Sequence, residues 1–130
     1  MLIAFTRFVA LKASLTIDTD LFAGWRPLDA VSDCSVVLGV GGPSPDHNKK
    51  RVEALFTIET RGRDYHETEA RAVAIFDAVH TQAGVTFPVV GGETVWSADF
   101  IRGTKPRSTG IGEKRLHYFW TSFTVHGVSE

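Results

Sequence analysis

The clearest pattern of apolar and polar positions runs from residue 51 to residue 80. From residue 52 to 61 apolar or β-branched residues alternate with polar ones, Leu55 excepted, which predicts a strand. From residue 64 to 80 the period changes to 3.6, and an apolar stripe predicts an amphipathic helix. The stripe consists of Tyr65, Ala72, Val73, Ile75, Phe76 and Val79.

Turn and cap signals mark the ends of these two elements. Gly62 permits a change of backbone direction that a Cβ atom would disfavour. Asp64 occupies the position of a helix N-cap, and Glu67, three residues later, completes a variant of the capping box. Gly84 follows the helix as a stop signal. We therefore expect one long helix over about residues 64–80.

The remaining segments predict further strands and a second helix. The spacing of Phe5, Phe8, Val9 and Lys12 favours a short amphipathic helix over a strand near the N-terminus. Strands are expected at residues 34–40, 85–90, 94–102 and 114–126, with connecting segments at residues 18–27, 41–50 and 103–113. The pattern predicts a single α+β domain over residues 1–130. Its twisted, mainly antiparallel sheet of four to five strands would carry both helices.

The last expected strand carries large side chains on both faces. Leu116, Tyr118 and Trp120 share one face, and Phe119, Phe123 and Val125 share the other. A small sheet packs one face on its helices, and its other face is ordinarily polar. A second helix, a loop or another subunit must then cover the second face, and exposed apolar patches usually mark partner surfaces. Phe119, Trp120 and Phe123 are the candidate subunit interface.

Composition narrows the class of protein. Of the 130 residues, 43% are hydrophobic and 22% are charged, which is ordinary for a soluble globular chain. The net charge of −1 argues against nucleic-acid binding by the whole surface. The single cysteine, Cys34, excludes an intramolecular disulfide and is expected to be a buried thiol. Arg7 and Lys12 interrupt the apolar N-terminal stretch, so we expect neither a signal peptide nor a membrane partner.

Motifs that could support catalysis or ligand binding are incomplete. Residues 39–42 are glycine-rich and follow a predicted strand, but the residues after them do not match a phosphate loop. None of the five histidines has metal-ligand spacing: His47, His66, His80, His117 and His126. Asp46 and His47 could form half of an acid–base pair, yet no nucleophile motif accompanies them. We expect no catalytic residue, cofactor, metal or small-molecule ligand; a ligand-binding domain or enzyme using Asp46, His47 and Cys34 is the alternative.

Basic residues gather in two expected loops. Lys49, Lys50 and Arg51 close the first, and Arg102, Lys105 and Arg107 occupy the second. Charges of this kind are ordinarily solvated. In the functional interpretation, both loops face an acidic partner ring or the DNA that it surrounds. Aromatic residues do not alternate with these basic residues, and the sequence has no recognised nucleic-acid-binding motif. Sequence-specific nucleic-acid binding is therefore not expected.

Several segments together resemble one protein family. They are the strand end Thr-Arg-Gly-Arg-Asp-Tyr at residues 60–65, the helix Glu-Thr-Glu-Ala-Arg-Ala-Val-Ala-Ile-Phe-Asp-Ala-Val-His at residues 67–80, and the loop Gly-Gly-Pro-Ser-Pro-Asp at residues 41–46. The segment Asp-Thr-Asp-Leu-Phe-Ala-Gly-Trp-Arg-Pro at residues 18–27 and a final aromatic strand after a Gly-rich loop belong to the same pattern. Over roughly residues 15–126 the chain resembles the tail-terminator family of long-tailed bacteriophages, also called tail-completion or minor capsid proteins.

The resemblance implies a structural, non-enzymatic role. Members of that family form rings, commonly hexameric, at the head-proximal end of the tail tube, where they stop its polymerisation and provide the head-joining surface. The implied partners are copies of the chain, the tail tube protein and the head connector protein, in the virion after assembly in the host cytoplasm. If the resemblance holds, the basic charge of two loops makes them candidates for the surface that faces the tube or its lumen. These loops are Lys49 to Arg51 and Arg102 to Arg107. Another head–tail connector component of the neck is the alternative within the same class.

Overall fold

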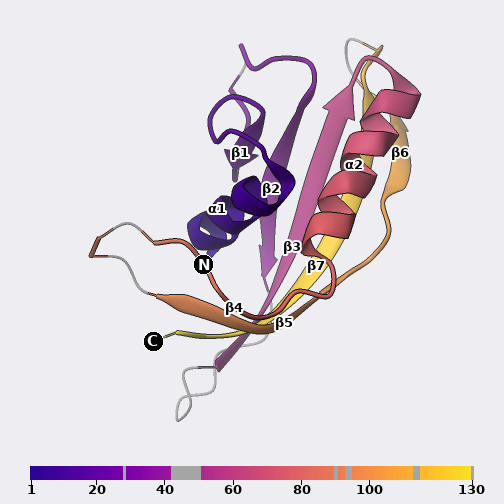
Figure 1. Cartoon of the computed structure of the whole chain (residues 1–130). Helices are drawn as coiled ribbons and strands as arrows, with labels where there is room; N and C mark the ends of the chain where they lie inside the picture. The colour runs from indigo at the N-terminus through magenta and orange to yellow at the C-terminus, as the bar shows by residue number, and fades with distance from the viewer. Residues whose placement is uncertain (28, 42–50, 90, 93–94, 113–114, 130) are drawn as a thin grey trace.

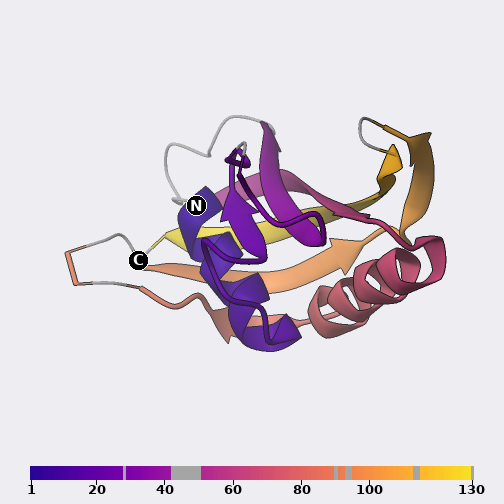
Figure 2. The ribbon, with the colours of Figure 1, turned by 90° about the horizontal axis from the view of Figure 1, so that it is seen from above.

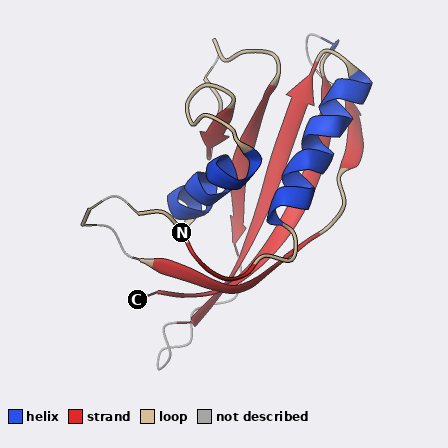
Figure 3. Ribbon diagram, in the orientation of Figure 1, coloured by secondary structure: helices blue, strands red, loops and turns tan. Residues whose placement is uncertain are grey.

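The computed structural model describes residues 1–27, 29–41, 51–89, 91–92, 95–112 and 115–129 (Figure 1). Its helices and strands are α1 (Leu2–Ala13), β1 (Leu21–Ala23), β2 (Cys34–Gly41), β3 (Arg51–Gly62), α2 (Tyr65–Val79), β4 (Ala83–Thr86), β5 (Trp96–Gly103), β6 (Arg107–Ile111) and β7 (His117–Ser129). Both helices lie on one face of a curved sheet (Figure 3). They pack side by side in a single layer, as the view from above also shows (Figure 2).

The sheet is mainly antiparallel, and its strand order is β1-β2-β3-β7-β5-β4. Among the pairs of described strands, β1 and β2 alone run parallel. β6 and β5 pair with the same edge of β7, one after the other, and between them the Thr104 N–H donates to the Ser122 carbonyl at 2.8 Å. The α+β class is confirmed, but the described residues contain seven strands rather than four to five.

Two of the additional strands fall in segments that we expected to be connectors. β1 lies within residues 18–27 and has three residues, too few to show a period-2 pattern. β6 lies within residues 103–113, and all five of its side chains are exposed, so no apolar alternation marks it. It is identified instead by its ladder with β7, which begins at the pair Arg107 and Trp120.

The predicted strand and helix over residues 51–80 are confirmed. Phe56, Ile58 and Thr60 are buried on the helix side of β3, as the alternation predicts. Asp64 is the N-cap of α2, and its Oδ2 accepts a hydrogen bond from the Glu67 N–H at 2.8 Å. The buried stripe of α2 differs in part from the expected one. It consists of Thr68, Ala72, Ile75, Phe76 and Val79, whereas Tyr65 and Val73 are exposed.

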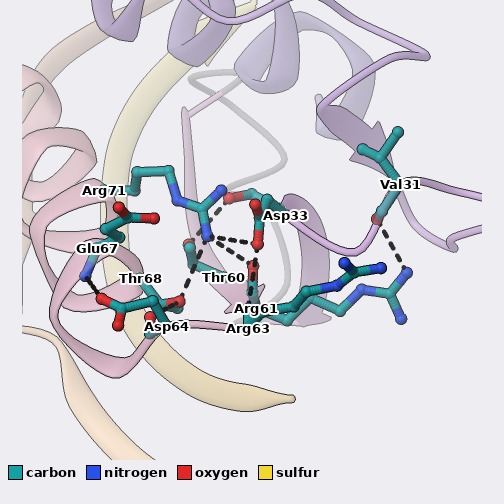
Figure 4. Close-up of polar contacts among 10 residues, drawn as sticks. Val31, Asp33, Thr60, Arg61, Arg63, Asp64, Glu67, Thr68 and Arg71 are labelled. Carbon is teal, nitrogen blue, oxygen red and sulfur yellow. Dashed lines mark hydrogen bonds and ion pairs between the residues drawn. The ribbon is translucent and has the colours of Figure 1, made fainter. Parts of the chain in front are cut away.

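Two glycines act differently from the expectation. Gly62 does not have a positive φ; instead, a Cβ atom there would lie 2.2 Å from both Arg71 Nη2 and Thr68 Oγ1. It is required because the side chains at the start of α2 pack against the backbone of β3 (Figure 4). Gly84 does not end α2, because it lies within β4. The residue with a positive φ just after α2 is Thr81, at 67°.

The core lies between the helix layer and the sheet. The N-terminal helix is confirmed, and it buries Phe5, Phe8 and Val9. Phe5 stacks on Phe56 of β3 with ring centroids 4.4 Å apart, and lies 6.1 Å from the ring of Phe123 of β7. Aromatic contacts of this kind stabilise the core beyond the area that they bury.

A β-bulge in β5 places Phe100 on the face opposite to the one that the alternation predicts. Strict alternation along the strand predicts that Trp96, Ala98 and Phe100 share one face, but the register against β7 shifts between Ala98 and Phe100. Asp99 is the extra residue, so Ala98 is buried beneath the helices while Phe100 turns to the opposite face, where it is 39% exposed. The strand expected at residues 85–90 lies slightly earlier, at β4.

Candidate interaction surfaces

The first candidate surface is the face of the sheet that turns away from α1 and α2, called the outer face below. On β7 it is formed by the even-numbered residues from 118 to 126, because the odd-numbered residues from 119 to 127 are buried under the helices. Near β1 and β2 a loop covers it, and there Phe22, Cys34 and Val36 form a small buried cluster with Ala30. Cys34 is thus a buried thiol, as expected. No helix covers the part of this face over β3, β7 and β5 (Figure 3).

A three-residue network crosses the middle of the outer face. Trp120 Nε1 donates to Glu59 Oε2 at 3.0 Å, and these two residues are directly opposite each other in the β3–β7 ladder. Arg26 Nη1 forms an ion pair with Glu59 Oε1, also at 3.0 Å. Both charged side chains are largely buried, while Trp120 remains 37% exposed. The carboxylate therefore fixes the indole and anchors the loop that contains Arg26.

A second group lies further along the same face. The rings of Phe100 and His126 stack with centroids 4.2 Å apart. His126 Nδ1 lies 4.0 Å from Glu53 Oε2, and the Arg102 guanidinium lies 5.9 Å from the Phe100 centroid. This group combines an exposed aromatic ring with both signs of charge, which is the chemistry of a protein contact surface.

The structure brings together only part of the predicted basic set. Arg102 and Arg107 lie opposite Thr124 and Trp120 of β7, so both side chains are on the outer face. Lys105 lies in the connection between β5 and β6. Lys49 and Lys50 fall outside the described residues. Arg51 begins β3, but its side chain also falls outside the description.

The register spreads the described basic residues along β7. Arg51 is opposite Val128 of β7, whereas Arg107 is opposite Trp120. Eight residues of a strand span about 26 Å, so these two positions lie near opposite ends of β7. Arg102, opposite Thr124, lies between these two positions.

The candidate subunit interface is wrong for two of its three residues. Phe119 and Phe123 are 2% and 1% exposed within a single chain. Phe119 packs against Tyr65 of α2 and Phe123 against Phe5 of α1, so neither ring has surface left for a second copy. Only Trp120 remains available for contact. The surplus of aromatic residues on β7 is explained mostly by the chain's own helices.

A polar cluster fixes the end of the loop that covers part of the outer face (Figure 4). Asp33 Oδ1 accepts a hydrogen bond from the Arg63 N–H at 3.1 Å and lies 3.5 Å from Arg71 Nη2. Arg71 Nη2 also donates to the Arg61 carbonyl at 2.9 Å, and Arg61 Nη2 donates to the Val31 carbonyl at 3.2 Å. These contacts join the loop, β3 and α2, so their role is structural.

Of the residues of the alternative chemical site, Cys34 alone lies in the described part of the chain. Asp46 and His47 lie outside the described residues, and Cys34 is buried. His80 Nδ1 accepts a hydrogen bond from the Gly103 N–H at 2.8 Å, which ties the end of α2 to β5. Within the described ranges, no three His, Cys, Asp or Glu side chains are grouped as a metal site requires. Neither described helix has the length and apolar character of a membrane span.

Sequence reasoning missed three residues of the outer face. Glu59 was placed on the polar face of its strand, but its pairing with Trp120 depends on the register between β3 and β7. Arg26 comes from a segment expected to be a connector. Phe100 was assigned to the wrong face because nothing in the alternating pattern reveals the bulge. Both strands of the Glu59–Trp120 pair were predicted, but their register was not.

Comparison with solved structures gives a likeness of fold. No family model matches the chain, and no curated protein matches it. A chain in the solved structure of the virion of a native gene transfer agent particle has a similar fold, with a TM-score of 0.54. The match covers 94% of this chain and 84% of that chain at 12% sequence identity. At this identity the likeness shows a shared fold.

Proposed function

We propose that this chain is a structural component of a phage or prophage virion, without enzymatic activity. More specifically, we propose that copies form a ring on the head-proximal end of the tail tube, where the ring ends polymerisation and provides the head-joining surface. A hexamer is the ring size that the family resemblance suggests. The partners would be further copies of the chain, the tail tube protein and the head connector protein.

The observation that carries this proposal is the outer face of the sheet. Trp120 and Phe100 are more than a third exposed there, and Arg102 and Arg107 lie on the same face. Aromatic residues and arginine are enriched where proteins bind one another. The face therefore fits a protein partner. We assign it to the contact with the tail tube protein or with the head connector protein.

The fold likeness supports the same class of role. The similar chain belongs to the virion of a gene transfer agent particle, and the match extends over nearly all of the chain described here. The sequence resemblance to tail terminators points in the same direction. A different head–tail connector component shares this class and differs in its partner. For the ligand-binding or enzymatic alternative we find no specific supporting observation.

Copurification with candidate partners tests the proposal. Tagged chain is mixed with tail tube protein or with portal protein, and we expect retention of the tail tube protein. Arg107→Glu and Trp120→Ala should each weaken that retention, because both alter the outer face. His66→Glu is the control, because His66 is exposed and lies on α2, which packs on the opposite face of the sheet. Retention of portal protein alone would favour the connector alternative, and retention of neither protein would contradict the proposal.

A further inference from the structure

A second surface lies on the helix layer, at the side of α2 next to the β5–β6 connection. It is an open hollow of about 310 Å³ lined by Glu69, Val73, Phe76, Asp77, Lys105 and Pro106. Val73 is 39% exposed at this hollow, although the sequence pattern placed it in the buried stripe. The hollow thus has an apolar lining and two carboxylates on its helical side.

The chain's own N-terminal helix does not cover this hollow. α1 approaches α2 elsewhere, where Ala13 and Leu15 line a smaller space of about 110 Å³ together with Ala74 and Ile75 of α2. None of the residues that line this smaller space lines the hollow. α2 is therefore covered by α1 on one side and carries the hollow on another.

An exposed part of α1 has the complementary chemistry. Leu11 is 67% exposed, on a helix that buries its other face. Lys12 follows it, with its Nζ 5.9 Å from the centroid of Phe8, and Arg7 lies one turn earlier. The helix contains these two basic residues and no acidic residue.

We propose that the hollow beside α2 of one copy receives Leu11 of the α1 helix of the next copy. This inference rests on the proposed function, because it describes how the copies of the ring contact one another. Leu11 would cover Val73 and Phe76, and Lys12 would approach Glu69 and Asp77. Each copy would then place its α2 between its own α1 and the α1 of a neighbour, so that the helix layer continues from copy to copy.

Charge favours a second copy over another occupant. The basic α1 faces a hollow that is lined by two carboxylates, Glu69 and Asp77, and by one basic residue, Lys105, so the two surfaces carry net charges of opposite sign. The two surfaces are different patches of the same chain, so the contact is heterologous. A heterologous contact repeats from copy to copy and closes into a ring when the rotation between copies allows it. A contact in which a patch binds the same patch on a second copy is isologous and would give only a dimer.

Two single substitutions test the contact in solution. We expect Leu11→Glu and Val73→Glu each to raise the concentration at which copies associate by at least about tenfold, measured by light scattering. Both side chains are exposed, so at concentrations where the wild type is monomeric the thermal unfolding of either variant should match that of the wild type. Val31→Glu is the control, because Val31 is also an exposed aliphatic residue but lies outside both surfaces.

Mixing the two variants gives the most specific result. A copy with Leu11→Glu retains an intact hollow, and a copy with Val73→Glu retains an intact Leu11. An equimolar mixture should therefore form a 1:1 complex of two chains and nothing larger, because only one contact can form. Variants that fail to fold could not produce this complex.

The outcomes separate this inference from the proposed function. If the wild type associates and both variants associate equally well, the hollow is not the contact, while the ring remains possible through another surface. If both variants are monomeric and their mixture stays monomeric, the contact between Leu11 and the hollow is contradicted. If the wild type is monomeric at every concentration, the ring itself is contradicted, and the contact with it.

Discussion

Trp120 and Glu59 are joined across the β3–β7 ladder by a hydrogen bond of 3.0 Å on the outer face of the sheet. The other oxygen of the same carboxylate forms an ion pair with Arg26 at 3.0 Å. One side chain thus holds both an exposed aromatic ring and the loop beside it. The shape of the proposed contact surface depends on this carboxylate.

Removal of Glu59 should destabilise the fold. Glu59→Ala leaves the largely buried Arg26 without its ion pair, and we expect the free energy of unfolding to fall by about 3 kcal/mol. Urea unfolding measures this loss. Glu53→Ala is the control, because Glu53 is more exposed and lies 4.0 Å from His126, so its loss should stay below about 0.5 kcal/mol. Equal losses for the two variants would contradict the role of Glu59.

The missing Cβ atom at Gly62 should be essential for packing. Gly62→Ala places a methyl group 2.2 Å from Arg71 Nη2 and Thr68 Oγ1, so we expect a loss of about 2 kcal/mol from overpacking. Thermal unfolding and urea unfolding both measure it. Gly39→Ala is the matched control in β2, where nothing lies within 4 Å of the added atom. That variant should be neutral or slightly stabilising, and a similar loss at both positions would refute the packing explanation.

The two aromatic positions of β7 should respond differently to truncation. Phe123→Ala removes a ring that is buried against α1, and we expect it to lower the free energy of unfolding by about 3–5 kcal/mol. Trp120→Ala should lower it by about 1–2 kcal/mol, because much of the indole is already in water. Chemical unfolding of both variants provides the comparison. A larger loss at Trp120 would contradict the assignment of faces on β7.

The start of α2 should depend on the Asp64 side chain. Asp64→Ala removes the acceptor for the Glu67 N–H and should cost about 1 kcal/mol. Asp64→Ser retains an oxygen that can accept the same hydrogen bond, so most of the stability should return. Urea midpoints of the two variants check this, and an equal loss for alanine and serine would show that the cap is unimportant.

The fold was predictable where the sequence carries a long periodic signal. The strand and helix over residues 51–80 have twelve and fifteen residues in the structure, and their apolar positions follow the two periods closely. The N-cap at Asp64 was readable because capping depends on neighbouring residues only. Features that depend on residues close in sequence were therefore recovered.

Features that depend on distant pairing were not recovered. β1 is too short for a period, β6 is exposed throughout, and the bulge at Asp99 changes the facing of Phe100 without any change in the apolar pattern. The assignment of Phe119 and Phe123 to a subunit interface was wrong for the same reason. The sequence shows that β7 has aromatic residues on both faces, but only the packing of α1 and α2 decides that Phe119 and Phe123 are buried while Trp120 is exposed.

The most direct test of the central claim is the length of tails assembled with and without this chain. Electron microscopy of particles made in its absence should reveal tail tubes that vary in length or grow beyond the normal length and carry no heads. Supplying the wild-type chain should restore one length and head joining, because a ring would then cap each tube. Tails of normal length that join heads in its absence would contradict the proposed function.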